Sequence, residues 1–201
     1  MLNKDEIRKL YDNRVISDGN VVESLGWRSK EQQFLRFEFL TRGLDFKLAS
    51  ILDIGCGYGD FISFLESKNI KFSKYVGIDL SAEMIKEAKL RFNNHKNTSF
   101  LNVDFASLTG VNVDYAIASG SLNYRLNENM ELYLEEFIKK YSKKVNLGLL
   151  FNLLSTKVDY MQDYHMHYDP KIVESIVLKY FEKCHIFQNY GLYEFTIQGI
   201  K

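Results

Sequence analysis

The sequence has little of the chemistry that marks secreted or membrane proteins. Its 201 residues include only two cysteines, Cys56 and Cys184, and a single proline. Two cysteines cannot form the disulfide framework of a small secreted domain, and they lack a zinc-ligand spacing. No apolar run is long enough to span a bilayer, and the charged N-terminal residues lack the apolar core of a signal peptide. These absences predict a cytoplasmic protein without a membrane partner.

The chain also lacks an excess of charge of either sign. Lys and Arg number 26, Asp and Glu also number 26, and the formal net charge is +0. Without a basic bias there is no general electrostatic attraction for nucleic acid or anionic membranes, so we expect neither as a partner. Apolar residues make up 46% of the chain, which is typical of a globular domain. The composition leaves the oligomeric state open.

Strand-like and helix-like segments alternate after residue 46. Apolar strand patterns cover about 49–54, 74–79, 99–103, 113–118 and 147–153, and amphipathic helix patterns lie between most of them. This alternation predicts a parallel sheet with helices on its faces. A last helix starts at Asp169, with Pro170 at its favoured first position, and two short strands over 184–189 and 193–199 indicate a closing hairpin. We expect one domain over 47–201, preceded by a helical N-terminal segment over 1–46.

The first strand runs into the glycine-rich sequence Asp53–Gly59 (DIGCGYG), and a helix pattern begins at Asp60. Glycines at such a junction let the backbone turn tightly and approach a ligand without a Cβ clash. The N-terminus of the following helix presents free N–H groups and a partial positive charge, which suit a phosphate or a carboxylate. This segment therefore predicts a cofactor loop.

Two classes of cofactor use a loop of this kind. The dinucleotide fingerprint is G-x-G-x-x-G or G-x-G-x-x-A, whereas here the third glycine comes one residue early and Asp60 stands in the last slot. An aspartate there would repel a pyrophosphate. Asp53 can instead accept a hydrogen bond from an ammonium group, which S-adenosylmethionine (SAM) has and NAD lacks. We therefore favour SAM over NAD, and both over a tight turn without a ligand.

A second acid ends the next strand. Asp79 follows Gly59 by 20 residues, and an acid at this place can accept from both ribose hydroxyls of an adenosyl ligand. Without the glycine loop it would be only a helix cap. Leu80 and Met84 can flank the adenine with apolar surface, although Met84 fits the core equally well.

The ends of the third and fourth strands complete the expected cofactor site. Asp104 can accept from the adenine amino group while Phe105 packs on the ring; a solvated loop acid is the alternative. After the fourth strand, the small residues Ser119 and Gly120 leave room for the sulfonium end of SAM.

The motifs 53–59, 77–85 (GIDLSAEMI) and 103–105 (VDF) together resemble the class I SAM-dependent methyltransferase family, close to its small-molecule (type 11/12) bacterial members. The resemblance covers about residues 48–200 as fold. It implies an α/β, Rossmann-like fold with a seven-stranded, mostly parallel sheet in the order 3-2-1-4-5-7-6, strand 7 antiparallel, and helices on both faces. It also implies SAM as methyl donor and S-adenosyl-L-homocysteine (SAH) as product. The expected cofactor contacts are Asp53, Gly55, Cys56, Gly57, Gly59, Asp79, Leu80, Met84, Asp104, Phe105, Ser119 and Gly120.

The sequence departs from one branch of this family. The Asn/Asp-Pro-Pro-Tyr signature of aminomethyltransferases is absent, and 119–122 (SGSL) stands in its place. Together with the balanced charge, this favours a small-molecule acceptor. The alternatives are a non-catalytic SAM-binding protein of the same fold and an RNA or protein methyltransferase.

Candidate acceptor contacts lie on both sides of the glycine loop. N-terminal segments of similar enzymes often fold over the cofactor as a lid, and a helix with a capping-box start at Ser29 would belong to it; a solvent-facing helix is the alternative.

Two histidines two residues apart, without a third ligand, predict no metal site. A general base is needed only if the nucleophile carries a proton of high pKa. We expect acceptor contacts from Tyr11, Trp27, Arg36, Asn123, Tyr124 and Tyr164, and a base, if one acts, from His165, His167 or Tyr124.

Overall fold

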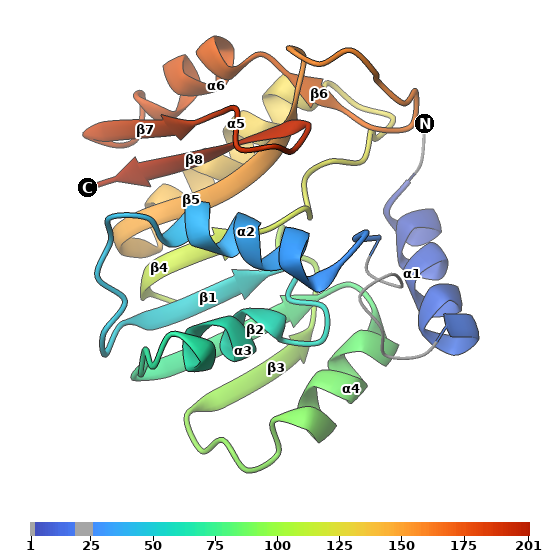
Figure 1. The fold of residues 1–201 in the computed structure, drawn as a ribbon, viewed down its shortest axis with the longest axis vertical. Coiled ribbons are helices and arrows are strands. Elements are labelled where there is room, and N and C mark those ends of the chain that lie inside the picture. Colours follow the sequence, from blue (N-terminus) through green and yellow to red (C-terminus); the bar gives the residue numbers. More distant parts are fainter. Residues whose placement is uncertain (1–2, 19–25) are drawn as a thin grey trace.

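The structure is a computed structural model that describes residues 3–18 and 26–201 (Figure 1). Its strands are β1 (Ser50–Ile54), β2 (Lys74–Asp79), β3 (Thr98–Asn102), β4 (Val113–Ala118), β5 (Val145–Ser155), β6 (His167–Tyr168), β7 (Lys183–Phe187) and β8 (Glu194–Ile200). Its helices are α1 (Lys4–Asp18), α2 (Lys30–Thr41), α3 (Asp60–Ser67), α4 (Ala82–Arg91), α5 (Met130–Ser142) and α6 (Pro170–Val177). Over the described ranges, no helix is both long enough and apolar enough to cross a membrane.

These strands form one sheet in the order β3-β2-β1-β4-β5-β8-β7, with β6 paired to β5. The first five strands of this order are parallel, and β8 is antiparallel to both of its neighbours. The expected order and the antiparallel strand are confirmed. The difference is β6, which lies in a segment expected to be loop throughout. It forms because β5 continues to Ser155, where its last two residues pair with His167 and Tyr168.

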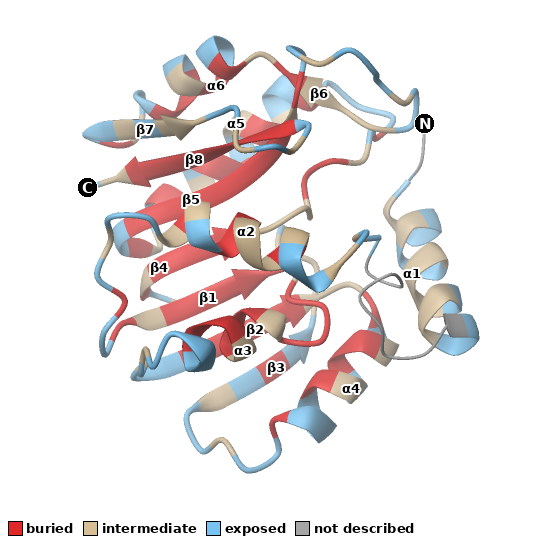
Figure 2. Cartoon of the chain, in the orientation of Figure 1, coloured by how far each residue is buried: buried red, intermediate tan, exposed pale blue. Residues whose placement is uncertain are grey.

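The central strands supply two cores, one on each face of the sheet. Successive side chains of a strand point to opposite faces, so Ile51 packs with α2 and α3 while its neighbour Leu52 packs with α5 and α6. Figure 2 shows β1, β4 and β5 buried along most of their lengths. Because helices cover both faces, these strands are continuous apolar runs in the sequence.

The carboxyl ends of β1, β2 and β3 lie at one edge of the sheet, and α1 lies beyond that edge (Figure 1). Two contacts hold α1 there. The Lys4 Nζ atom lies 2.8 Å from an Asp104 carboxylate oxygen, and the Ser81 hydroxyl donates to Asp12 at 2.5 Å. These contacts tie the N-terminal helix to the segment after β3 and to the start of α4.

Helix α2 is fixed to the sheet by one buried glutamine. The Nε2 atom of Gln198, a fully buried residue of β8, donates to the carbonyls of Phe39, Leu40 and Arg42 at 3.3, 3.1 and 3.0 Å. The last carbonyls of a helix have no partner within the helix. Gln198 therefore ends α2 and sets its position on β8.

Replacing Gln198 by Leu is expected to lower the free energy of unfolding by about 1–3 kcal/mol, because buried carbonyls lose their donor. Urea unfolding followed by circular dichroism measures this change. Gln188→Leu, at an exposed position just after β7, is the control and should change stability little. Equal stability of the two variants would contradict the role given to Gln198.

Candidate functional site

A cavity of about 520 Å³ lies at the carboxyl edge of the sheet. Its volume is within the range of small-molecule sites. On the predicted cofactor side it is lined by Asp53, Gly55, Cys56, Gly57, Asp79, Leu80, Met84, Phe105, Ser119 and Gly120. On the predicted acceptor side it is lined by Tyr11, Trp27, Arg36, Asn123, Tyr124, Tyr164, His165 and His167. The structure thus brings most of the residues singled out from the sequence around one space.

The glycine loop is held against the end of β2 by its backbone. The amides of Gly55 and Cys56 both donate to the Ile78 carbonyl, at 2.8 and 3.0 Å. Gly55 and Gly57 have φ angles of 72° and 51°, a region that favours glycine. A Cβ on Gly55 would also lie only 2.5 Å from the Cβ of Ser121. Side chains larger than hydrogen are therefore excluded at Gly55 by both conformation and space.

Two residues of the loop have a packing role. Gly59 is the N-cap of α3 with a φ of 78°, and a Cβ there would lie 2.8 Å from the Phe92 ring. Gly59 is not among the described residues that line the cavity. The Cys56 sulfur approaches Gly77 of β2, and burial raises the pKa of this thiol, so it stays protonated at neutral pH.

Asp53 is a buried carboxylate at the end of β1. It accepts a hydrogen bond from the Tyr75 hydroxyl of β2. Burial raises the pKa of Asp53 to about 7, the hydrogen bond from Tyr75 opposes this, and the nearby charge of Asp79 adds to it. No pattern in the sequence singled out Tyr75, because its hydroxyl reaches Asp53 only through the parallel pairing of β1 and β2.

The Asp79 carboxylate joins the glycine loop to the start of α4. Its Oδ2 atom accepts from the Gly57 amide at 3.0 Å and its Oδ1 atom from the Ser81 amide at 2.9 Å. Burial raises the pKa of Asp79, and these backbone hydrogen bonds oppose the rise. Each carboxylate oxygen has a further lone pair, so Asp79 can still accept from a ligand in the cavity.

Asp104 does not line the cavity in the part of the chain that the structure describes, whereas its neighbours Val103 and Phe105 do. Its Oδ2 atom pairs with Lys4, and its Oδ1 atom accepts from the Ala106 amide at 2.8 Å. The carboxylate therefore closes a turn after β3 and fastens α1. Its expected contact with an adenine amino group stays a prediction.

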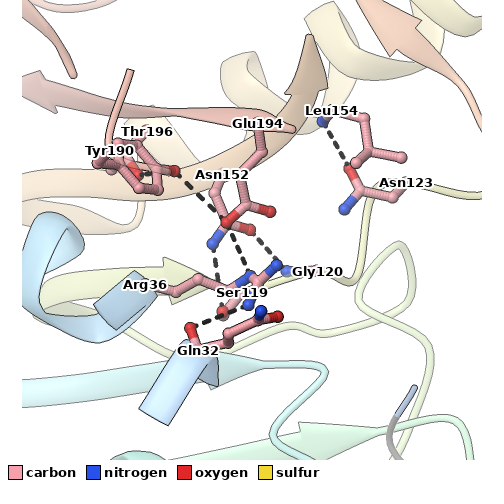
Figure 3. Close-up of polar contacts among 10 residues, drawn as sticks. All are labelled: Gln32, Arg36, Ser119, Gly120, Asn123, Asn152, Leu154, Tyr190, Glu194 and Thr196. Carbon is pink, nitrogen blue, oxygen red and sulfur yellow. Dashed lines mark hydrogen bonds and ion pairs between the residues drawn. The ribbon is translucent and has the colours of Figure 1, made fainter. Parts of the chain in front are cut away.

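The turn after β4 is shaped by a buried amide that sequence reasoning missed. Asn152 of β5 is fully buried; its Oδ1 atom accepts from the Gly120 amide at 2.8 Å, and its Nδ2 atom donates to the Ser119 hydroxyl at 3.3 Å (Figure 3). Ser121 donates to the Ile54 carbonyl at 2.9 Å. The one feature of the sequence that could have pointed to Asn152 is that it is a polar residue inside the apolar run of the fifth strand.

A buried ion pair lies on the acceptor side. The Arg36 Nε atom of α2 is 2.7 Å from the Glu194 Oε1 atom of β8 (Figure 3). The Arg36 guanidinium lies 4.2 Å from the centre of the Trp27 ring. Trp27 in turn packs on Gly120, where a Cβ would lie 2.3 Å from the ring. Burial raises the pKa of Glu194 and Arg36 opposes it. Sequence reasoning missed Glu194; an acid opening an apolar strand was its only signal.

Aromatic side chains and histidines surround the rest of the acceptor side. The rings of Tyr11 and Tyr124 meet edge to face with centroids 6.0 Å apart, and the His165 ring lies 5.4 Å from Tyr124. Burial, then the charges of His167 and Arg14, lower the pKa of His165, and burial also lowers that of His167. Both imidazoles are therefore neutral at pH 7 and able to accept a proton.

No group of three His, Cys, Asp or Glu side chains is arranged to hold a metal ion within residues 3–18 and 26–201.

A family model and a relative identify the family of the chain, and the solved structures share its fold. The model of a methyltransferase domain family matches residues 52–142. Rv1506c of Mycobacterium tuberculosis, which is named as a methyltransferase, is 33% identical over 154 residues, or 74% of this chain and 90% of that protein. Magnesium protoporphyrin IX methyltransferase from Synechocystis PCC 6803, crystallised with SAH, has a TM-score of 0.70 at 15% identity, covering 99% of this chain and 100% of that one. A SAM-dependent methyltransferase from Aquifex aeolicus has a TM-score of 0.61 at 17% identity, and the match covers 86% of this chain and 93% of that one.

The raised pKa of Asp53 predicts a pH dependence of stability. Between the ordinary Asp pKa of 3.8 and about 7, the folded protein keeps a proton that the unfolded chain releases. The wild type should therefore lose stability relative to Asp53→Asn as pH rises through this window, by up to about 1.4 kcal/mol per pH unit, and level off above it.

Urea unfolding at several pH values from 4 to 8 measures the difference between the two proteins. Asp163→Asn, at an exposed position, is the control and should follow the wild type throughout. Parallel curves for the wild type and Asp53→Asn would show that Asp53 titrates normally.

Proposed function

The chain belongs to the class I SAM-dependent methyltransferase family, and we propose that it transfers the methyl group of SAM to a small molecule bound in the cavity at the carboxyl edge of the sheet. The observation that supports this proposal is that one cavity of about 520 Å³ is lined by both the glycine loop and the aromatic acceptor side. A donor and an acceptor bound there would share one cavity.

The residues at the glycine loop fit the chemistry of SAM. Without a Cβ at Gly55 and Gly57, the backbone can approach the methionine part closely. Asp53 offers a carboxylate to its ammonium group, and Asp79 has lone pairs left for the ribose hydroxyls. Leu80, Met84 and Phe105 give an apolar wall for the adenine, with Gly120 beside the sulfonium. SAM would supply a methyl group already activated by the positive charge on sulfur.

The protein's own contribution is alignment and exclusion of water. Holding two reactants in line can lower the barrier by several kcal/mol. Trp27 and Arg36 from the N-terminal segment cover one side of the cavity, and the Tyr- and His-rich segment 155–168 covers another. His165 and His167, as neutral imidazoles, are the candidates to accept a proton from a nucleophile that still carries one at neutral pH. The proposed lid over 1–46 acts through these contacts.

A small acceptor is favoured over a macromolecule by the shape of the site and by the charge of the chain. Lys4, Tyr11 and Arg14 of α1 line the same cavity as the glycine loop, so the helix stands beside the reacting centre. With a net charge of +0, the protein also lacks the basic surface excess that draws nucleic acid.

Calorimetric titration of the purified protein with SAM, SAH and NAD tests the cofactor assignment. We expect heat with SAM and SAH and none with NAD, because Asp60 and the early third glycine disfavour a pyrophosphate. Binding of NAD, or no binding of SAM or SAH, would overturn the proposed function.

Replacing Asp79 by Ala should weaken SAM binding by about 10- to 150-fold, because hydrogen bonds to a charged group are lost. Asp79→Asn, which keeps one acceptor oxygen, should lose less. Asp45→Ala, an exposed acid ahead of β1, is the control and should bind SAM like the wild type. Unchanged affinity in Asp79→Ala would remove the ribose assignment.

A further inference from the structure

Glu194 has a buried carboxylate oxygen without a hydrogen-bond partner among the described residues. Its side chain is 1% exposed, and the residue lines the cavity. Its Oε1 atom lies 2.7 Å from Arg36 Nε and accepts from the Tyr190 hydroxyl at 3.4 Å, whereas Oε2 has no donor. A buried acceptor without a donor destabilises the folded protein. A donor on a ligand in the cavity would remove this destabilisation.

Arg36 is held so that its Nε atom contacts only one of these two oxygens, as an ion pair without a hydrogen bond from Nε. Its Nη1 atom donates to the Gln32 carbonyl at 2.9 Å, and its guanidinium lies over the Trp27 ring. Turning toward the Glu194 Oε2 atom would break these contacts. The ion pair therefore fixes the Glu194 carboxylate and leaves Oε2 to accept from another group.

The position of Glu194 suits contact with the molecule that receives the methyl group. Figure 3 shows its side chain reaching from the start of β8 toward Arg36. The Arg36 guanidinium lies over the Trp27 ring, and that ring packs on Gly120. In the proposed function the reactive end of SAM lies beside Gly120. A group that donates to Glu194 would then lie near the methyl group.

Some of the large aromatic side chains that line the cavity are exposed to solvent. Tyr160, Tyr164 and Tyr193 line the cavity and are 65%, 47% and 50% exposed. Large apolar groups gathered at the rim of a pocket indicate a ligand-binding surface. Tyrosine rings stack on planar apolar surfaces. The rim thus suits a flat, ring-containing ligand.

We propose that the acceptor is a planar aromatic compound carrying an O–H or N–H group, and that Glu194 Oε2 accepts a hydrogen bond from this group. Glu194 selects the acceptor by this hydrogen bond, and Arg36 is a positioning residue that holds it. The inference rests on the proposed function, because it concerns the acceptor of the same methyl transfer.

The test uses protein saturated with SAH and three probes with one ring system: 2-naphthol, 2-methoxynaphthalene and 2-naphthoate. Calorimetry measures the affinity of each probe after SAH binding has been measured separately. The wild type should bind 2-naphthol about 10- to 150-fold more tightly than either other probe, the range for a hydrogen bond to a charged group.

The Glu194→Gln variant tests whether Glu194 contacts the probe, because a purely structural role would not change the preference for 2-naphthol over 2-methoxynaphthalene. The positive Arg36 guanidinium, whose Nε atom lies 2.7 Å from Oε1, attracts the amide oxygen and repels the amide NH₂, so the NH₂ takes the place of Oε2 and presents a donor. The preference for 2-naphthol over 2-methoxynaphthalene should then disappear or invert, with SAH affinity unchanged. Glu135→Gln, which alters the ion pair with Lys179 outside the cavity, is the matched control and should keep the wild-type preference.

Losing one charge of a buried ion pair can unfold a protein, so Glu194→Asp is the second variant. It keeps the charge beside Arg36 but draws the carboxylate back by one methylene, and it should weaken 2-naphthol binding without inverting the preference.

If 2-naphthoate binds most tightly, if no probe binds, or if the Glu194 variants keep the wild-type preference, this inference is overturned while SAH binding still supports the proposed function. If SAH does not bind, the proposed function fails and this inference fails with it.

Discussion

The junction between the glycine loop and the end of β2 is the constraint on which the rest of the site depends. Two loop amides share the Ile78 carbonyl, and a third donates to Asp79. These bonds fix the turn that carries the β1 carboxylate Asp53 and opens α3. Parallel pairing of β1 with β2 brings Tyr75 to Asp53. The backbone hydrogen bonds of the glycine loop thereby position the cavity wall formed by Asp53, the loop and Asp79.

A second feature of the molecule is that the charged groups on the two sides of the cavity differ: carboxylates lie on one side and an ion pair on the other. Asp53 and Asp79 lie on one side with pKa values raised by burial, which suits a ligand that brings a cationic or hydroxyl group. On the other side, Arg36 and Glu194 neutralise each other across α2 and β8. Because desolvated charges are costly unless paired, this ion pair joins the N-terminal segment to the last strand and ties two distant parts of the chain to one cavity.

The N-terminal segment is part of the site through particular contacts. Lys4 and Asp12 fasten α1 to Asp104 and Ser81, and Gln198 fastens α2. These bonds are formed by side chains far apart in sequence, so movement of the segment would have to break them. They also explain why Asp104 faces α1: its carboxylate is engaged by Lys4 and the Ala106 amide.

The sequence by itself determined the alternation of strands and helices and the location of the glycine loop, because apolar strand runs, glycines and helix caps such as Ser29, Ser81 and Asp169 are local properties. The strand order followed from the family resemblance of the motifs at 53–59, 77–85 and 103–105. Most of the residues that the sequence singled out line the cavity, and those at strand ends do so because the carboxyl ends of parallel strands meet at one edge. Only the tertiary structure decided what depends on pairing between distant elements: Tyr75 on Asp53, Asn152 under Gly120, and Glu194 opposite Arg36. Gly59 and Asp104 were expected in the cavity lining but lie outside it. Gly59 packs on Phe92 and Asp104 pairs with Lys4, and no local pattern in the sequence contains either contact.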